Sequence, residues 1–186
     1  RERPQKGRYR QFHQMNFEIL GSNDTFADVE LIILSKQILT SLFPSKKFEI
    51  QINSLGDRDT LKLFKSKLSS YFEKYSSNLS EESQKKIHSN PLRILDSKNN
   101  KDIKISHDAP VIESFYSKTS TKKFEEVKTM LDNVNVEFVI NKTLVRGLDY
   151  YSQTVFEIKT KDLGSQDTLI GGGRYDGLIK KIGGPD

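Results

Sequence analysis

Apolar positions recur every three to four residues in three stretches of the chain, and this spacing predicts three long helices. The first should begin after residues 22–24, where Ser, Asn and Asp are good N-caps, and end at Pro44. The second should begin near Asp59 in a lysine- and serine-rich stretch, and a short polar helix from Ser80 to His88 should follow it. The apolar faces of the three long helices contain Phe26, Val29, Ile32, Ile33, Leu39 and Leu42; Leu61, Phe64, Leu68, Phe72 and Tyr75; and Phe124, Val127, Leu131 and Val134.

Alternation with period two, bounded by turn residues, predicts strands. One should follow the basic start of the chain and cover residues 12–19, and a half-buried strand should cover 48–52. Strand-like sequence returns at 136–139, 155–158 and 168–170, with glycines between and after the last two that suggest a meander. This order of elements predicts an α+β fold with an antiparallel sheet.

Three parts of the chain differ in composition. Residues 1–57 and 121–186 contain the predicted strands and form the two parts of one core, whereas 58–120 are rich in polar helix and predict a helical insertion. The chain begins at an arginine and ends in the turn-like sequence Gly-Gly-Pro-Asp. We therefore expect that it is cut at both ends.

Composition narrows the classes of function. The 186 residues, 34% of them hydrophobic, can bury one core, and a net charge of +5 favours a polyanionic partner or substrate. The chain has no cysteine and three scattered histidines, which predicts no metal site built on these side chains. The longest apolar stretch, 29–34, is too short to cross a bilayer and the start is charged, so we expect a cytoplasmic protein without a membrane segment.

The first segment that carries chemistry is RERPQKGRYRQFHQMNFE, at residues 1–18. Its arginines lie on a Gly/Pro loop and can offer forked donors to phosphate oxygens, although a charge run alone also fits a solvated basic hairpin. Tyr9 and Phe12 offer planar faces to a base. Gln14 and Glu18 are four residues apart, so on a strand they would point to one side and could bind one ligand.

Two further segments follow in the last third of the chain. LVRGLDYYSQTVFE crowds Arg146 and two adjacent tyrosines, Tyr150 and Tyr151, around a glycine turn. On a strand, adjacent tyrosines point to opposite faces, so one could line a pocket while the other packs; both could equally be core aromatics. IGGGRYDGL fits neither a dinucleotide fingerprint nor a P-loop, and its glycines form either a strand bulge or a ligand-facing wall from which Tyr175 projects.

Together these segments resemble histidyl-tRNA synthetases, class II aminoacyl-tRNA synthetases built on an antiparallel sheet. RERPQKGRYRQFHQ resembles the loop and second strand of their motif 2, and LVRGLDYYSQTVFE and GGGRYDGL resemble their two histidine signatures, in family order. INSLGD, NPLRILDSK and LGSQ also resemble family sequence, so the resemblance covers essentially the full chain. It implies a class II synthetase-like sheet flanked by helices with a helical insertion, and ATP-dependent ligation of L-histidine to its tRNA through a histidyl-adenylate.

The resemblance implies an ATP-binding side of the site. Glu2 and Arg8 would contact the adenine edge and the terminal phosphate, and Phe12 would stack on adenine. Arg146 would lie between the substrate carboxylate and the α-phosphate and would be the catalytic residue, because charge builds there as pyrophosphate leaves. ATP is the second substrate and would bring Mg²⁺, and the full-length protein would be a homodimer.

The resemblance also implies a histidine pocket. Gln14 would hold the α-amino group, Glu18 and Tyr151 would bond the two imidazole nitrogens, and Tyr150 and Tyr175 would close the pocket. A neutral imidazole has one N–H donor and one bare acceptor, so a carboxylate opposite a phenol can recognise both. A ligand without that pair would leave buried polar groups unsatisfied, which would give selectivity for histidine.

Several family segments are expected to lie outside this chain: motif 1, the motif 2 arginine, motif 3 and the anticodon-binding domain. We therefore expect the isolated polypeptide to catalyse little or nothing. Two alternatives stay open. A synthetase-like regulatory or binding subunit that does not charge tRNA would be free to lose Arg146, Glu18 or Gln14, all of which are present. A generic basic RNA-binding module would have no tight site for free histidine.

Overall fold

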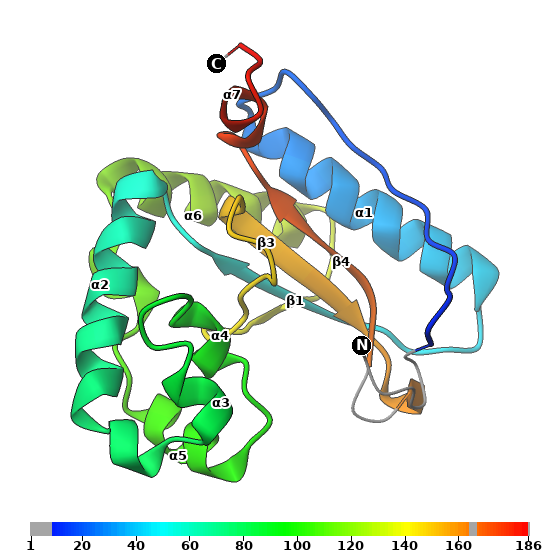
Figure 1. Ribbon diagram of the computed structural model, residues 1–186. Coiled ribbons are helices and arrows are strands. Elements are labelled where there is room, and N and C mark those ends of the chain that lie inside the picture. Colours follow the sequence, from blue (N-terminus) through cyan, green and yellow to red (C-terminus); the bar gives the residue numbers. More distant parts are fainter. Residues whose placement is uncertain (1–8, 164–166, 186) are drawn as a thin grey trace.

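The computed structural model of the chain describes residues 9–163 and 167–185. Strands lie near the middle of the molecule, and most of the short helices gather on one side (Figure 1). The strands are β1 (Glu49–Ser54), β2 (Val139–Ile140), β3 (Ser152–Lys159) and β4 (Thr168–Arg174). The α-helices are α1 (Thr25–Leu42), α2 (Arg58–Lys74), α3 (Glu81–Gln84), α4 (Leu92–Leu95), α5 (Asn100–His107), α6 (Lys118–Asn133) and α7 (Leu178–Lys181).

The described strands form one sheet in the order β2-β1-β3-β4. Strand β3 runs antiparallel to both β1 and β4, whereas β2 pairs with β1 in parallel. The predicted α+β class is confirmed, and the sheet is antiparallel except for this short parallel pair at one edge.

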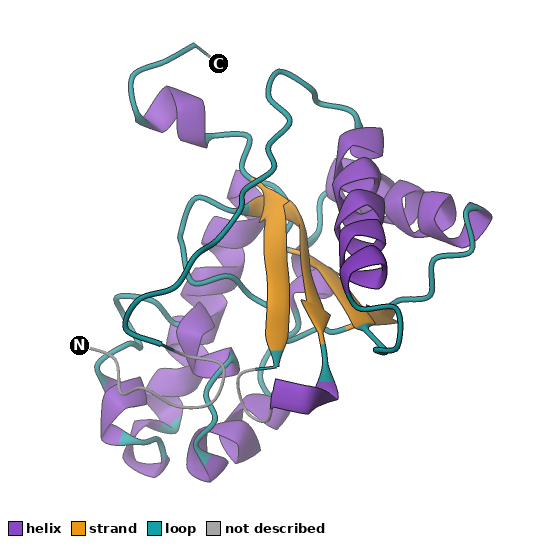
Figure 2. Ribbon diagram, turned by 90° about the vertical axis from the view of Figure 1, so that its right-hand side faces the viewer, coloured by secondary structure: helices purple, strands orange, loops and turns teal. Residues whose placement is uncertain are grey.

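Helices α1 and α6 cover one face of the sheet (Figures 1 and 2). Ile52 of β1 and Phe156 of β3 pack against these helices. Because side chains alternate along a strand, the neighbouring residues Gln51 and Glu157 lie on the opposite face, where they are register partners. The buried residues of the helix-covered side are Val29, Ile32, Leu39, Ile50, Ile52, Phe124, Val127, Leu131, Val136, Phe156 and Ile158.

A second hydrophobic cluster holds the helices of the middle of the chain together and joins them to the sheet. Beside this cluster, the fully buried Asp102 accepts hydrogen bonds from the hydroxyls of Ser80, Ser83 and Ser97. The cluster consists of Leu55, Leu61, Phe64, Leu68, Phe72, Leu79, Ile87, Leu92, Ile94, Ala109, Ile112, Leu144, Val145 and Val155.

The three predicted long helices are confirmed, and polar side chains cap their first turns. Asp24 accepts from the backbone N–H of Phe26 at 2.9 Å and begins α1. The predicted polar helix at 80–88 is wrong in length, because α3 ends at Gln84 and turns follow it. The eight-residue helix α5 lies inside the predicted helical insertion, at residues for which no individual helix was predicted. Within the described part of the chain, no helix is both long enough and apolar enough to cross a membrane.

The strand predicted at residues 12–19 is wrong. These residues are exposed and have no regular secondary structure. A strand is stable only when its backbone pairs with a neighbour, and no described strand pairs with this segment, although its alternating sequence suits one. The strand predicted at 136–139 is reduced to β2, since only Val139 and Ile140 pair with β1.

Candidate active site

A bulge at the start of β3 determines how the two adjacent tyrosines are presented. Gln153 has a φ of 48°, and the register between β3 and β4 shifts between Ser152 and Val155. Tyr150 lies in a turn and Tyr151 directly precedes the strand, so neither belongs to a strand and the prediction that they point to opposite faces of one is wrong. Their ring centroids are 4.7 Å apart, with the ring planes tilted by 36°.

Tyr175 completes a group of three tyrosine rings. It follows β4 directly, and its ring meets Tyr150 edge-on at 5.9 Å and Tyr151 edge-on at 6.5 Å between centroids. All three rings are half-buried. The two segments that carry these tyrosines thus build one aromatic wall.

Glu18 joins this wall through Tyr175. The phenol of Tyr175 donates to Oε2 of Glu18 at 2.6 Å. Burial, together with the hydrogen bond to Glu18 and the charge of its carboxylate, raises the pKa of Tyr175 to about 12. Tyr175 is therefore a neutral donor at physiological pH. The resemblance implied that Tyr175 closes the pocket, and the geometry adds that it holds the carboxylate of Glu18.

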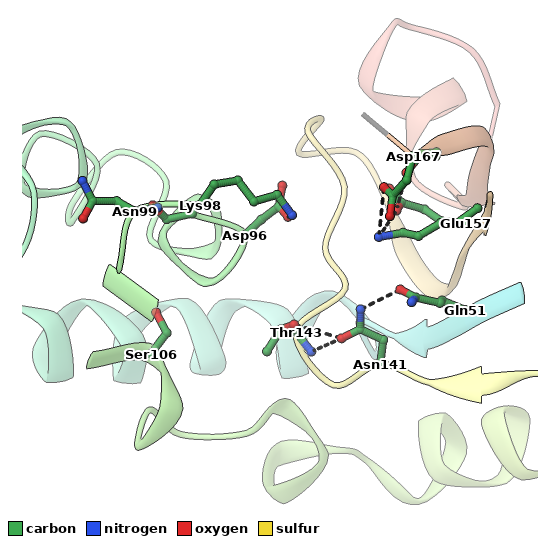
Figure 3. Close-up of polar contacts among 12 residues, drawn as sticks. Gln51, Asp96, Lys98, Asn99, Ser106, Asn141, Thr143, Glu157 and Asp167 are labelled. Atoms are coloured by element: carbon green, nitrogen blue, oxygen red, sulfur yellow. Dashed lines mark hydrogen bonds and ion pairs between the residues drawn. The ribbon is translucent and has the colours of Figure 1, made fainter. Parts of the chain in front are cut away.

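The loop that carries Arg146 is anchored on the sheet. The side chain of Asn141 donates to Gln51 of β1 at 2.8 Å (Figure 3). Two residues after Gln51 on β1, the side chain of Asn53 donates to the backbone oxygen of Leu144 at 3.0 Å. Val145 is buried, so the backbone immediately before Arg146 is fixed by hydrogen bonds and by packing.

Arg146 lies across β3 and β4 on the face of the sheet opposite α1 and α6. Its Nη1 donates to Oε1 of Glu157 at 2.6 Å, and its guanidinium carbon is 5.7 Å from the centroid of the Tyr151 ring. Its buried Nε has no hydrogen-bond partner among residues 9–163 and 167–185. Gly171 allows this position, because a Cβ there would lie 2.5 Å from Nη1 of Arg146.

Arg174 is a residue that sequence reasoning missed. Its buried guanidinium forms an ion pair with Asp28 of α1 at 2.9 Å and donates to the backbone oxygens of Ser22 and Asp24. These contacts fasten the start of α1 to the end of β4, next to Tyr175. The partners are about 150 positions away along the chain, so the sequence contains no local signal for them.

The structure does not bring every predicted residue to this place. Gln14 is exposed and its amide donates to Oδ1 of Asn16 at 3.1 Å, and the ring of Phe12 is 68% exposed. Glu2 and Arg8 lie outside the described residues. Arg146, Tyr150, Tyr151, Tyr175 and Glu18 form one connected group through the contacts described above.

Two further observations concern metal binding and the location of an open groove relative to the predicted site residues. Among residues 9–163 and 167–185, no group of three or more His, Asp or Glu side chains could hold a metal ion. An open groove of about 830 Å³ lies between the segments around 45–50, 137–139 and 159–162, and none of the predicted site residues lines it.

Known proteins similar to this chain are aminoacyl-tRNA synthetases. A model of the histidyl-tRNA synthetase family matches residues 1–186. A histidine–tRNA ligase of Ehrlichia ruminantium (strain Gardel) is 52% identical over 183 residues, which are 98% of this chain and 44% of that relative. The crystal structure of apo S. aureus histidyl-tRNA synthetase is 30% identical, with a TM-score of 0.67 over 89% of this chain and 40% of that one. The chain belongs to the histidyl-tRNA synthetase family.

A second solved structure bears on the alternative function. It is described as an ATP phosphoribosyltransferase regulatory subunit/histidyl-tRNA synthetase from Bacillus halodurans C, and it is 24% identical to this chain. The TM-score is 0.52 over 89% of this chain and 46% of that one, so this likeness shows the fold alone. The chain spans less than half the length of the Ehrlichia relative, so the activity of a full-length protein is a separate inference.

Proposed function

We propose that the full-length protein carrying this chain ligates L-histidine to its tRNA, with ATP, through a histidyl-adenylate. The observation that carries the proposal is the group formed by Arg146, the three tyrosines and Glu18 in a member of the histidyl-tRNA synthetase family. The group combines a fixed cation with phenols and a carboxylate, which are the polar groups that an amino acid with an imidazole side chain requires.

Histidine would be recognised through its two ring nitrogens. Glu18 accepts from the N–H of the imidazole, and Tyr151 bonds the other nitrogen. Tyr175 keeps the carboxylate of Glu18 in place by donating to its Oε2, and Tyr150 packs against the other two rings. Gln14 would turn from Asn16 to the α-amino group of the substrate. An amino acid without the imidazole pair leaves Glu18 or Tyr151 without a hydrogen-bond partner once it occupies the pocket, and is rejected.

Arg146 would carry the chemical step. In adenylate formation a carboxylate oxygen of histidine attacks the α-phosphorus of ATP, and the bond to pyrophosphate breaks. The guanidinium of Arg146 binds both the attacking carboxylate and an α-phosphate oxygen, so it holds the two reactants in line and stabilises the charge of the transition state. Glu2, Arg8 and Phe12 would bind the remainder of ATP. The adenylate then passes its histidyl group to a hydroxyl of the tRNA: the ester bond forms, the bond between the acyl carbon and the phosphate oxygen breaks, and AMP and the hydroxyl proton leave.

Further properties belong to the same proposal. Mg²⁺ would accompany ATP, held mainly by the phosphates, which is its usual mode in nucleotide sites. The full-length protein would be a homodimer and would act in the cytoplasm, where tRNA is charged for translation. Residues 58–120 would form an insertion between the two parts of the catalytic core, residues 1–57 and 121–186.

The alternative is a synthetase-like subunit that regulates another enzyme and does not charge tRNA. The likeness to the B. halodurans structure is compatible with it at the level of fold. Such a subunit has no need for a guanidinium positioned beside a histidine pocket, so the retained contacts of Arg146 with Glu157 and Tyr151 favour the synthetase.

Histidine-dependent exchange of pyrophosphate into ATP tests the proposal. The full-length protein should exchange only when histidine is present, and Arg146→Ala should lower the rate by about 10³-fold, because Arg146 meets charge that is largest in the transition state. Equal binding of ATP by the variant, measured by calorimetry, is the control. An intact protein that binds histidine but shows no exchange would support the regulatory alternative.

A further inference from the structure

Glu157 is the residue that touches the proposed catalytic guanidinium most closely. Its Oε1 accepts from Nη1 of Arg146 at 2.6 Å, and both side chains are largely buried, with 15% of Glu157 and 21% of Arg146 exposed. We propose that Glu157 is a positioning residue for Arg146: it orients the guanidinium for catalysis without touching the substrate. This inference rests on the proposed catalytic function of Arg146.

Glu157 is itself held in place on its other side. Its Oε2 accepts from the hydroxyl of Thr168 at 2.9 Å and lies 3.5 Å from Nζ of Lys159. Nζ of Lys159 also lies 3.7 Å from Oδ1 of Asp167, so one ammonium is paired with both carboxylates, which Figure 3 labels. Glu157 thus projects from the central strand β3 with both carboxylate oxygens engaged, which makes it a rigid anchor.

Arg146 needs such an anchor, because its own position in the chain does not fix its side chain. It lies in the loop between β2 and β3, and an arginine side chain has several freely rotating bonds. The contacts that confine it are the ring of Tyr151, the bare surface of Gly171 and the carboxylate of Glu157. Of these three, only Glu157 gives a directional bond, which specifies where the guanidinium points.

The geometry of the pair leaves donors of Arg146 for the substrate. Glu157 engages Nη1 through a single oxygen, so it does not take the whole face of the guanidinium as a bidentate partner would. Nearby, the charge of Glu157 is balanced by Lys159. The arrangement therefore orients Arg146 while the remaining N–H groups of Nη1 and Nη2 stay available to a carboxylate and a phosphate oxygen.

Kinetics of pyrophosphate exchange by the full-length protein test this inference. Glu157→Ala should lower kcat by about 10- to 100-fold, with less than a threefold change in KM for histidine or ATP, because a cation displaced by about 1 Å loses transition-state contacts first. Glu157→Gln keeps an acceptor of the same shape and should lose less, about three- to tenfold. Asp167→Asn, which touches Lys159 but not Arg146, should stay within twofold of the unsubstituted protein.

A double variant separates positioning from a general structural effect. In an Arg146→Ala background, Glu157→Ala should change the rate less than twofold, since there is no guanidinium left to orient. Losses that multiply in the double variant, or unchanged kcat in Glu157→Ala, would overturn the inference. If Glu157→Ala does not fold, the kcat of Glu157→Gln decides in the same way. Absence of exchange in the unsubstituted protein would instead refute the proposed function.

Discussion

A methyl group added at Gly171 would meet the guanidinium of Arg146. The new Cβ would lie 2.5 Å from Nη1, 2.7 Å from Nη2 and 2.8 Å from Cζ. Ordinary contacts between such atoms are roughly 3.5 Å long, so the guanidinium must move by about 1 Å. The atoms that move are the far end of a flexible side chain, so Gly171→Ala should change the free energy of unfolding by less than about 1 kcal/mol, whereas a 1 Å misplacement of a catalytic group lowers kcat by about 10²-fold.

Gly172→Ala is the matched control, because its Cβ points to the other face of the sheet. There it would lie 2.7 Å from Cε1 of Phe156, a buried ring packed under α1 and α6. Overpacking of this kind destabilises by about 1–3 kcal/mol without touching Arg146. Pyrophosphate exchange by the full-length protein and urea unfolding should therefore give opposite results for the two variants. A Gly171→Ala variant with unchanged kcat would refute the placement of Arg146 against β4.

Three other predictions concern Tyr175, Arg174 and Asp57, the last of which caps α2 by accepting from the backbone N–H of Thr60 at 2.8 Å. Tyr175→Phe removes the donor to Glu18, so calorimetry should show histidine binding weakened by about 1.5 kcal/mol, roughly tenfold; unchanged affinity would contradict this. Arg174→Ala leaves Asp28 buried without its ion partner, and urea unfolding should show a loss of about 3–5 kcal/mol, whereas a loss below about 1 kcal/mol would exclude a structural role. At Asp57, burial raises the pKa of the carboxyl, but hydrogen bonds, chiefly from Ser117, outweigh burial and lower the pKa from 3.8 to about 2. Because this folded-state pKa is depressed, its contribution to stability is present above about pH 4 and is lost as pH falls towards 2; Asp57→Asn should flatten the stability curve in that window, and an unchanged curve would contradict the assignment.

Local sequence signals predicted the long helices and the central strands well. Asp24 caps α1 as expected, and the apolar spacing of α2 and α6 follows their buried faces. The strand at 12–19 failed because pairing depends on a neighbouring strand, which the local pattern of residues cannot supply. The parallel pairing of β2 with β1 is likewise a property of the whole sheet.

The candidate site shows the same division between local and long-range information. The segments that resemble the histidine signatures predicted Arg146, Tyr151 and Tyr175 as site residues. Their mutual contacts, however, depend on the bulge at Gln153, and the sequence does not indicate this bulge because its positive φ occurs at a residue other than glycine. Glu157 was within the quoted segment, yet only the alternation of β3 and the register with β4 bring it to the guanidinium. The partners of a side chain across a sheet are set by register, which a single sequence does not specify.

The central proposal is that the full-length protein carrying this chain charges tRNA with histidine, and the most direct measurement is aminoacylation itself. The full-length protein would be incubated with ATP, a tRNA for histidine and radiolabelled histidine, and acid-precipitable label on the tRNA would be counted, with Arg146→Ala in parallel. The account predicts ester-linked histidine on the tRNA and a rate about 10³-fold lower in the variant. No charging by an intact protein that binds both histidine and ATP would contradict it.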